Sequence, residues 1–368
     1  MKQLKMLLAA SIFLFVITSS PLSSYAISAN GAILMEQHSG RVLYEKNAHT
    51  PMRIASITKI MTAILAIESG KLNETVTISN KAAGTEGSSL YLLPGEKAKL
   101  EDLVYGLMLR SGNDSAVAIA EHVGGNLESF VKMMNQKAKE LGMEQTIFAN
   151  PHGLDDHENH YSSAYDMALV TQYAMKNETY AIIAGTKSHT AKSLSEHGTV
   201  TWQNKNRLLT QLYPYCTGGK TGYTQRAKRT LVTTATKDNL DLIAVTINDR
   251  NDWKDHMRLY DQAFSEYELV DILKKDQIPN LLDDYFTDNL LVKEDFMYPL
   301  KREEKEALSL KAHFINPSKK QAEGKAAIKI GEIDIYMKED VIGEVPLYFN
   351  NILPKEPKSW WDKLKDAF

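Results

Sequence analysis

The segment that most constrains the fold runs from Ile54 to Ile67 and is apolar on nearly every side, until Gly70 ends it. A helix that is hydrophobic all round belongs inside a protein core, whereas a surface helix carries a single apolar stripe. We therefore expect this helix to run through the centre of a folded domain. Its early position in the chain makes it a central packing element for the later segments.

Two predicted β-hairpins stand far apart in the sequence. The first joins residues 32–35 and 41–44 around a Ser-Gly turn, and the second joins residues 230–235 and 240–246 around a Lys-Asp-Asn turn. Between them, roughly from 75 to 210, helical patterns alternate with polar loops. Strands at both ends of a helical middle predict an α+β domain, in which an antiparallel sheet is completed when the chain returns.

The length and texture of the chain predict more than one domain. With 43% hydrophobic residues, 368 residues can bury one large core and a smaller one. Beyond about residue 270, short alternating segments such as 326–330 and 333–336 predict a small β-rich domain. We expect four parts: a signal peptide (1–26), a main domain (27–270), a β-rich domain (271–353), and a linker with an amphipathic helix (354–368).

The first 26 residues have the layout of an export signal. Two lysines precede an apolar run from Met6 to Ile17, and the triplet Ser24-Tyr25-Ala26 comes after it, which predicts cleavage after Ala26. An uncleaved membrane anchor is the alternative, but the apolar run falls short of the roughly 20 residues that span a bilayer.

The last residues predict an amphipathic helix from Ser359 to Phe368. Trp360, Trp361 and Leu364 share one face with Phe368, and charged residues occupy the other face. Two adjacent tryptophans at an apolar-polar boundary suit a bilayer interface. We expect this helix to hold the protein on a membrane surface, and docking onto the protein's own surface is the alternative.

Charge and cysteine content narrow the chemistry. The formal net charge of −3 becomes −5 when residues 1–26 are removed, because they hold two lysines and no acid, so nucleic acid is not an expected partner. The single cysteine, Cys216, cannot form an internal disulfide. No Cys-His signature accompanies it, so we predict a small buried apolar residue and no catalytic thiol.

The first chemical motif is Ser56-Ile57-Thr58-Lys59, at the start of the apolar helix. Residues i and i+3 share a helix face, so Lys59 lies against Ser56 and can be the base that a serine nucleophile needs. Burial and nearby positive charge would lower the pKa of this lysine. The backbone N–H of Ser56 would point toward an oxyanion on the attacked carbonyl.

The same spacing occurs at Ser129-Phe130-Val131-Lys132, so the pattern alone is weak. That copy stands among polar neighbours, and no further motif comes after it in order. We interpret it as a surface coincidence.

The second motif is Ser111-Gly112-Asn113, on a loop after a helical segment. A hydroxyl can pass a proton between the base and a leaving amine, and an Asn amide can orient the lysine and bind a peptide carbonyl. Taken alone, this tripeptide is typical of an ordinary turn.

The third motif is Lys220-Thr221-Gly222, before the second hairpin. Lys220 and Thr221 offer a charge and a hydroxyl to a substrate carboxylate, and Gly222 lets the backbone approach a ligand closely. The N–H of Tyr223 can supply a second oxyanion donor. Three such motifs in this order, 55 and 109 residues apart, are the signature of class A β-lactamases and penicillin-binding proteins.

Four stretches resemble the low-molecular-mass D-alanyl-D-alanine carboxypeptidases: RIASITK (53–59), LMLRSGN (107–113), NPHGL (150–154) and GKTGYT (219–224). The resemblance covers nearly the whole mature chain, including the β-rich domain and the terminal helix. Through residues 213–215 and 227–232 the chain is most similar to the sporulation-associated carboxypeptidase of endospore-forming bacteria.

The resemblance implies the fold of the penicillin-recognising serine transpeptidases and β-lactamases. It implies that Ser56 attacks the carbonyl between two D-alanines of a peptidoglycan stem peptide, that the terminal one leaves, and that water hydrolyses the acyl-enzyme. β-Lactams would be covalent inhibitors, no metal or cofactor is required, and the enzyme would work at the outer face of the cytoplasmic membrane. The implied catalytic residues are Ser56, Lys59, Ser111 and Asn113, and the implied substrate-binding residues are Lys220, Thr221, Gly222 and Tyr223.

Other functions stay open on the sequence alone. The loop from His152 to His160 holds three histidines and acidic residues, but their spacing matches no standard zinc site. A class A β-lactamase would carry a Glu-x-x-Leu-Asn segment between the second and third motifs, and none occurs there. A non-catalytic wall-binding protein would not need the intact serine, lysines and Asn. Transpeptidase and endopeptidase activities leave no trace in these motifs.

One departure from the family pattern and one role remain. The family often has Ala-Gly where this chain has Ala227-Lys228, and added bulk there would narrow or recharge the edge of the site. A further basic residue often helps to hold the substrate carboxylate, and the sequence offers Arg226, Arg229, Arg250 and Arg258 without choosing among them.

Overall fold

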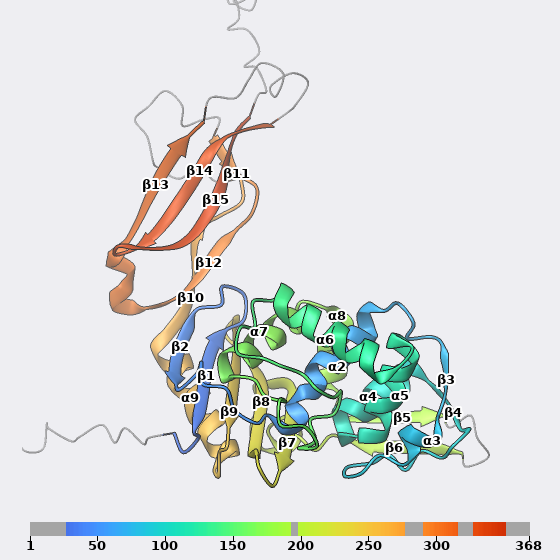
Figure 1. Cartoon of the computed structure of the whole chain (residues 1–368). Coiled ribbons are helices and arrows are strands. Elements are labelled where there is room, and N and C mark those ends of the chain that lie inside the picture. The colour runs from blue at the N-terminus through green and yellow to red at the C-terminus, as the bar shows by residue number, and fades with distance from the viewer. Residues whose placement is uncertain (1–26, 193–197, 277–289, 316–326, 351–368) are drawn as a thin grey trace, which may run out of the picture.

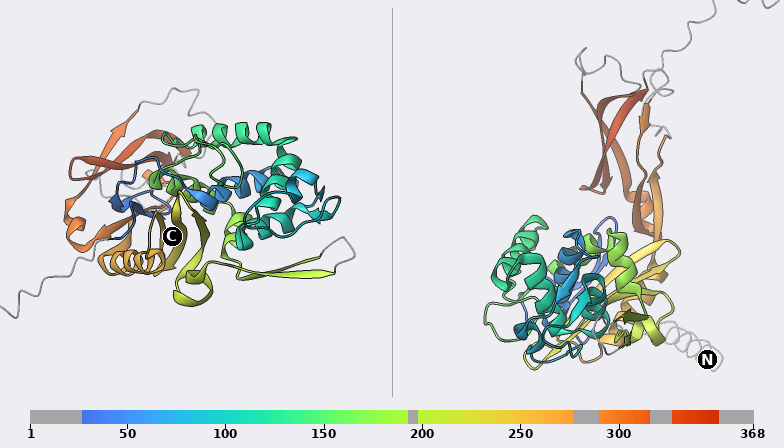
Figure 2. Two further views of the ribbon diagram at one scale, coloured as in Figure 1. Left: turned by 60° about the horizontal axis from the view of Figure 1, so that its bottom comes forward. Right: turned by 90° about the vertical axis from the view of Figure 1, so that its right-hand side faces the viewer.

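The computed structural model describes residues 27–192, 198–276, 290–315 and 327–350. The predicted signal peptide (1–26) and the predicted terminal helix (354–368) lie outside the described residues. Within the described part, no helix combines the length and apolar character needed to cross a membrane. The small β domain stands on one end of a larger α+β domain, as two views at right angles show (Figures 1 and 2).

The larger domain is built on one five-stranded antiparallel sheet. Its order is β2-β1-β9-β8-β7, so the first strands of the chain pair with strands from more than 190 residues later, with Ala32 opposite Thr246. This confirms the predicted return of the chain and both predicted hairpins. The strands are β1 (Gly31–Glu36), β2 (Val42–Lys46), β7 (Cys216–Thr224), β8 (Lys228–Lys237) and β9 (Leu240–Ile247).

The apolar helix lies at the centre of the helical side of this sheet (Figure 1). Every residue of α2 (Lys59–Glu68) except Glu68 is buried, which confirms the predicted core helix. A short 3₁₀ helix, η1 (Ala55–Thr58), leads into it. The surrounding helices are α3 (Asn80–Ala83), α4 (Leu100–Arg110), α5 (Asn113–Gly124), α6 (Leu127–Glu140), α7 (Ala164–Met175) and α8 (Glu178–Gly185).

Alternate residues of each strand serve two different cores, as the period of two in a strand requires. Ile33 and Val245 face the core around α2, whereas Leu34 and Ala244 face a second core. That second core is closed by α9 (Asp252–Glu266) and the single turn η2 (Leu208–Leu212). Two small hairpins, β3 (Thr75–Thr77) with β4 (Lys97–Lys99) and β5 (Ser188–Lys192) with β6 (Thr199–Gln203), complete the domain.

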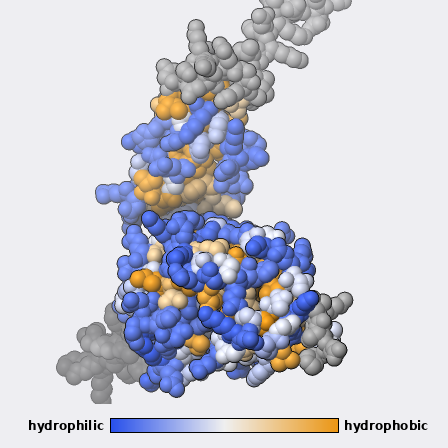
Figure 3. Space-filling model, turned by 45° about the vertical axis from the view of Figure 1, so that its right-hand side comes forward, coloured by the Kyte–Doolittle hydropathy of each residue, from blue (hydrophilic) through white to orange (hydrophobic). Residues whose placement is uncertain are grey.

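The small domain is all β within its described residues, apart from one short 3₁₀ turn, η4 (Arg302–Ala307). The segments 326–330 and 333–336, expected as separate strands, form one long strand, β14 (Ala327–Met337), with a register shift at Gly331. β10 (Tyr267–Leu273) pairs with β12 (Phe296–Lys301), and β11 (Leu290–Val292), β15 (Asp340–Asn350), β14 and β13 (Leu308–Phe314) form a four-stranded sheet. Hydrophobic residues gather on this domain in Figure 3, and its exposed large ones include Met297, Phe314, Ile315 and Val341.

Arg41, in the turn between β1 and β2, ties the two domains together. Its guanidinium forms a bidentate pair with Glu304, with bonds of 2.9 and 2.6 Å, and also donates to the carbonyl of Pro299. The same group lies over the rings of Tyr267 and Tyr298, at 5.3 and 5.2 Å from their centroids. This bidentate, ring-covered geometry is the type that makes an arginine ion pair specific.

Candidate active site

Ser56 lies on a tight turn that the sequence did not predict in detail. We expected a helix from Ile54 onward, but α2 begins at Lys59 and Ser56 belongs to the 3₁₀ helix η1. Ala55, just before it, has φ +49°, a strained conformation of the kind found at functional sites. Because a 3₁₀ helix has three residues per turn, residues i and i+3 eclipse, and the Nζ of Lys59 lies 2.9 Å from the Oγ of Ser56.

Two hydrogen bonds of the Lys59 Nζ determine where the remaining position on its nitrogen points. Its Nζ donates to the Oδ1 of Asn113 at 2.8 Å and to the carbonyl oxygen of His152 at 2.7 Å. The Nδ2 of Asn113 donates to the carbonyl of Glu86 at 2.6 Å, so the amide orientation is set. A neutral amine has two N–H donors and one lone pair. Because both other partners can only accept, the lone pair of a neutral Lys59 is directed at the hydroxyl of Ser56.

The surroundings of Lys59 favour this neutral form. The side chain is fully buried, and burial, followed by the positive charges of Lys220 and Lys205, holds its pKa well below the ordinary lysine value. The carboxylate of Asp114 acts in the opposite direction but is a smaller influence. An amine of this kind can accept a proton from Ser56, which is what activation of a serine nucleophile requires.

The second motif sits where two helices break, as predicted. α4 ends at Arg110, Ser111 adopts φ +65° and is 5% exposed, and Asn113 begins α5. The neighbouring Asp114 is buried, and its carboxylate accepts hydrogen bonds from the Oγ of Ser89 and from the N–H groups of Leu90 and Leu92. This carboxylate therefore fixes the loop that passes over the second motif.

The third motif lies on β7, the edge strand next to the nucleophile turn. Lys220 is 1% exposed, its Nζ donates to the carbonyl of Thr221 at 2.6 Å, and burial followed by the charge of Lys205 lowers its pKa to about 7. A Cβ on Gly222 would lie 2.9 Å from the backbone nitrogen of Ser56. The glycine is thus needed for the approach of β7 to the nucleophile turn, in addition to the ligand approach that we predict for it.

Thr221 and Tyr223 are less closely tied to the serine. Thr221 is half-buried on β7, and Tyr223 is 64% exposed and pairs in the sheet with Arg229. The direct contacts of the site thus join Ser56, Lys59 and Asn113, with Gly222 packed against the turn and Lys220 close enough to lower the pKa of Lys59. The catalytic and binding roles of all eight residues remain predictions.

Sequence reasoning missed the structural part played by the loop from Asn150 to Leu154. The carbonyl of His152 holds Lys59, and Gly153 has φ +87° with a Cβ position that overlaps the carbonyl oxygen of Ala55. Only glycine fits there, so this loop presses directly on the nucleophile turn. The run appeared among the family-like stretches, but a backbone carbonyl leaves no side-chain signal from which its role could be read.

Two of the three histidines in the loop from His152 to His160 form hydrogen bonds within the fold. His160 accepts from the N–H of Ala149 and shares a 2.9 Å hydrogen bond with Thr58, while the Nδ1 of His152 accepts from the N–H of Leu154. Burial is the main cause that lowers their pKa values, to about 4 for His160 and about 3 for His152. Across the described ranges, no three His, Cys, Asp or Glu side chains cluster in a way that could hold a metal ion.

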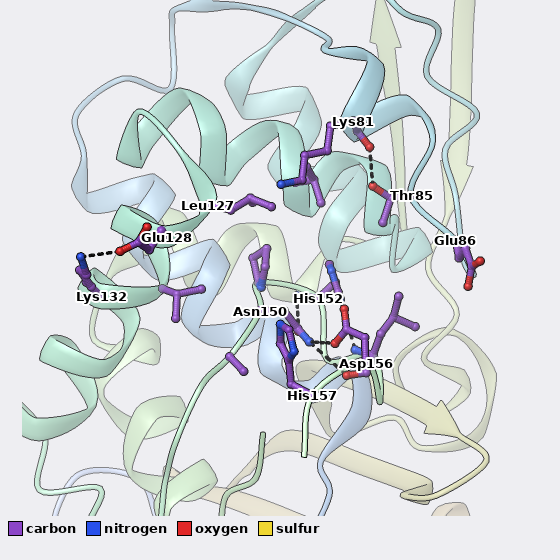
Figure 4. A pocket seen from close by; sticks show the side chains of 15 residues that line it. Lys81, Thr85, Glu86, Leu127, Glu128, Lys132, Asn150, His152, Asp156 and His157 are labelled. Atoms are coloured by element: carbon purple, nitrogen blue, oxygen red, sulfur yellow. Dashed lines mark hydrogen bonds and ion pairs between the residues drawn. The ribbon is translucent and has the colours of Figure 1, made fainter. Parts of the chain in front are cut away.

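A large cavity opens on the other side of this loop. It measures about 860 Å³ and lies between the loop and helices α3, α5 and α6. Figure 4 shows Asn150, His152 and Asp156 on the loop side, with Lys81 and Lys132 across the opening. The loop that holds Lys59 through the His152 carbonyl is therefore also the wall of a cavity big enough for several residues of a peptide.

The family departure at Lys228 has a conformational meaning. Lys228 has φ +59° at the first position of β8, directly after the turn from β7, a conformation that glycine adopts freely and that other residues adopt at a cost of about 1 kcal/mol. The exposed lysine also lines a cavity of about 420 Å³ together with Tyr223 and Arg250. The departure thus adds a positive charge at the rim near the third motif.

Of the four candidate arginines, three are engaged in ion pairs. Arg226 binds Glu158, Arg229 binds Asp252 at 2.7 Å, and Arg258 lies 3.5 Å from Asp255. Arg250 borders the 420 Å³ cavity and forms no ion pair with any described residue.

Cys216 is buried, and burial raises the pKa of its thiol to about 11. Its thiol is therefore not a reactive thiolate at neutral pH.

A serine hydroxyl that faces a buried amine of lowered pKa, beside a buried lysine on an edge strand, can carry out acyl transfer through a covalent serine intermediate. The chain belongs to the D-alanyl-D-alanine carboxypeptidase family, whose model matches residues 16–251, and the model for the penicillin-binding protein 5 C-terminal domain matches residues 267–355. These matches confirm the predicted family and fold class.

Named relatives and solved structures agree with the family. The D-alanyl-D-alanine carboxypeptidase DacF of Bacillus subtilis is 41% identical over 266 residues, which cover 69% of this chain and 67% of DacF. The crystal structure of penicillin binding protein 5 from Haemophilus influenzae matches with a TM-score of 0.74 and 27% identity, over 90% of this chain and 98% of that one. A DD-transpeptidase from Streptomyces matches with a TM-score of 0.62 and 32% identity, over 65% of this chain and 99% of its own.

Proposed function

We propose that this enzyme removes the terminal D-alanine from peptidoglycan stem peptides through an acyl-enzyme on Ser56. Lys59 takes the proton of the Ser56 hydroxyl as the oxygen attacks the carbonyl between the two D-alanines. Ser111 relays a proton to the leaving amine, and Lys220 with Thr221 binds the terminal carboxylate. The N–H groups of Ser56 and Tyr223 hold the oxyanion, and water then hydrolyses the ester.

One observation carries this proposal. The Nζ of Lys59 lies 2.9 Å from the Oγ of Ser56, and its two remaining contacts, to Asn113 and the His152 carbonyl, are to acceptors only. With a lowered pKa and its N–H groups occupied, this amine is oriented as a base and has no other evident use in the described fold.

The direct test is incubation with a pentapeptide that ends in D-Ala-D-Ala. The enzyme should release one D-alanine per peptide, and Ser56→Ala should abolish the release while the protein stays folded by circular dichroism. Dialysis against a chelator should leave the rate unchanged. Release that persists in Ser56→Ala would contradict the proposal.

The same experiments separate the alternatives. β-Lactams should acylate Ser56 and leave slowly, because their leaving group stays tethered, whereas rapid turnover of penicillin would indicate a β-lactamase. Absence of any covalent adduct would indicate a wall-binding protein without catalysis. Product analysis on cross-linked wall fragments distinguishes carboxypeptidase, endopeptidase and transpeptidase activities, and the similarity to a DD-transpeptidase makes that comparison worthwhile.

We also propose a location and a domain organisation. The signal peptide (1–26) would be cleaved after Ala26, the peptidase domain would be 27–270, the β-rich domain 271–353, and the helix within 354–368 would hold the enzyme on the outer face of the cytoplasmic membrane. The support for the domain organisation is that the last strand, β15, ends at Asn350 in a small domain of its own, which Figure 1 shows standing on the peptidase domain. Removal of residues 354–368 should release the enzyme from membrane vesicles without loss of D-alanine release.

A role in cell-wall or spore-cortex maturation is suggested by the resemblance to sporulation-associated enzymes. Deletion of the gene should leave muropeptides with an undegraded D-Ala-D-Ala end, either in vegetative walls or only in spores. The stage at which they accumulate identifies when the enzyme acts.

A further inference from the structure

Two carboxylates buried near one end of the main sheet are not fully satisfied by the described fold. Asp249 follows β9, Asp255 lies in the first turn of α9, and their exposed fractions are each 1%. The Oδ2 of Asp249 and the Oδ1 of Asp255 are buried and accept no hydrogen bond from the described residues. Buried polar atoms without a partner are rare in native proteins because they lose their hydration without replacement.

The cations nearby pair with acids other than Asp249. Arg229 binds the neighbouring Asp252, and Arg258 lies 3.5 Å from Asp255. Asp249 forms no ion pair with any described residue, and its pKa is raised by burial and, to a lesser degree, by the charge of Asp255. Among the described residues, the cluster thus lacks a hydrogen-bonding cation on the side of Asp249.

The chain segment that lies against this pair is the beginning of the main domain. The N–H of Ser28 donates to the Oδ2 of Asp255 at 2.7 Å, and its Oγ lies 2.5 Å from the Oδ1 of Asp249. Ile27 is 6% exposed in the core under α9, and its carbonyl accepts from Lys46 at 2.8 Å. Only three bonds join the nitrogen of Ile27 to that of Ser28, so the two nitrogens are at most about 4 Å apart and the nitrogen of Ile27 lies within about 7 Å of the Oδ2 of Asp255.

We propose that the α-amino group of Ile27, set free when the signal peptide is removed after Ala26, is the cation that binds Asp249 and Asp255. In the uncleaved chain the same atom is an uncharged amide with one N–H. After cleavage it is an ammonium group with three N–H donors, which can reach the unsatisfied oxygens of both acids. The inference rests on the proposed cleavage site, and separate experiments test the docking and the cleavage.

This docking would complete the fold next to the 420 Å³ cavity that borders the third motif. The N–H of Asp249 donates to the carbonyl of Arg229, and the turn after β9 lines the 420 Å³ cavity beside Tyr223 and Arg250. A fixed Asp249 therefore fixes one rim of the third motif. Signal removal would thus finish the assembly of the peptidase domain and would make the exported form more stable than the precursor.

The first experiment compares two full-length mature chains, one that starts at Ile27 after cleavage with a site-specific protease and one that retains Ala26. The Ile27 chain should melt about 3–6 °C higher at pH 7, since it alone places the charge at the acids. Asp249→Asn in both chains should remove this difference. Equal melting temperatures of the two unmutated chains, or a difference that survives Asp249→Asn, would overturn the proposal.

The pH dependence supplies an independent check. Pairing raises the pKa of the amine above its ordinary value of about 8, so the stabilisation should be complete below that value and lost as the pH rises through the raised pKa. The other charged or titratable groups that face the cluster are Arg229, Asp252, Arg258, His256, Tyr44 and Lys46, and they are the same in both chains. The difference in melting temperature between the two chains should therefore depend only on the α-amino group at the start of each chain.

The second experiment needs no mutation. Acylation of the α-amine by an amine-selective reagent at pH 7, followed by peptide mass spectrometry, should be at least about tenfold slower in the Ile27 chain than in the Ala26 chain, because a paired ammonium is protonated and shielded. Equal rates would contradict the docking. N-terminal sequencing of the exported protein tests the cleavage site itself. If the natural protein starts at another residue while the Ile27 amine of the engineered chain is protected, the cleavage proposal is overturned and the docking stands for the engineered chain alone.

Discussion

Two helices of the same domain carry the pattern Ser-x-x-Lys, and they differ in everything except the spacing. Lys59 is fully buried, contacts Ser56 and Asn113, and has a pKa well below the ordinary value. The side chain of Lys132 on α6 is 73% exposed and pairs with Glu128 at 2.8 Å, one helical turn away. In that copy the N–H of Ser129 donates to the side chain of Asn126, which caps the helix.

The difference shows that spacing brings a hydroxyl and an amine together, but burial makes the amine a base. An exposed lysine keeps its charge, and a charged ammonium cannot accept a proton from serine. The first copy owes its environment to elements distant in the sequence, namely β7, the 150–154 loop and the start of α5.

The largest expected effect comes from the serines themselves. Ser56→Ala should lower the rate of D-alanine release by at least about 10⁴-fold, because the nucleophile is lost. Ser129→Ala should leave kcat/KM unchanged, and steady-state assays on a pentapeptide measure both. Comparable losses in the two variants would show that the copies are not functionally distinct.

The lysines should show the same asymmetry at a smaller scale. Lys59→Met should slow acylation by penicillin by about 10²–10⁴-fold, the usual range for a lost general base. Lys132→Met, which removes a solvated ion pair, should have no measurable effect on acylation. Stopped-flow measurement with a fluorescent penicillin provides the rates, and fast acylation of Lys59→Met would rule out this base.

The pH profile should report Lys220, which shares the buried environment of Lys59. Its pKa is about 7, so above pH 7 it loses the charge that binds the substrate carboxylate, and kcat/KM should fall about tenfold per pH unit. Lys220→Arg keeps its charge and should move this decline to higher pH. A decline that is the same in Lys220→Arg would assign it to another group.

Asn113 is expected to act by positioning Lys59. Asn113→Ala should lower kcat about tenfold, since the amine loses the acceptor that turns its lone pair toward Ser56. The pH below which acylation slows should shift as well, which a purely structural role would not cause. An unchanged profile would leave Asn113 with a structural role only.

The smallest effect concerns stability. Because the pKa of Lys59 is lowered in the folded state, its protonation opposes folding, so this cost is present below the folded pKa and disappears as the pH approaches the ordinary lysine value of about 10.4. Relative to Lys59→Met, the wild-type protein should therefore gain about 2–4 °C in melting temperature between pH 7 and pH 10. The matched pair of wild type and Lys132→Met should show no such trend in calorimetry.

Much of the fold could be predicted because its signals are local. The all-round apolar pattern of residues 54–67 and the two hairpins specified α2 and four of the five strands of the main sheet. The order of the three motifs specified the family. The 3₁₀ start at Ser56 could not be predicted, because it depends on Gly153 and Gly222 packing against the turn from distant parts of the chain.

Only part of the candidate site could be predicted from the sequence. Side chains with chemistry, such as Ser56, Lys59 and Asn113, belong to recognisable motifs. Lys59 is also held by the carbonyl of His152, and its pKa is shifted by the charges of Asp114 and Lys205. A backbone group or a single charged residue forms no sequence pattern from which such a role could be predicted. Their roles emerge only from three-dimensional proximity.

The central claim is that burial makes Lys59 a base, and that Ser56 and not Ser129 is therefore the nucleophile. It is tested most directly by labelling the protein with penicillin and mapping the adduct by peptide mass spectrometry. We expect a single, slowly hydrolysed acyl group on the peptide that contains Ser56, and none on the peptide that contains Ser129. An adduct on another residue, or no adduct on a folded protein, would contradict that claim.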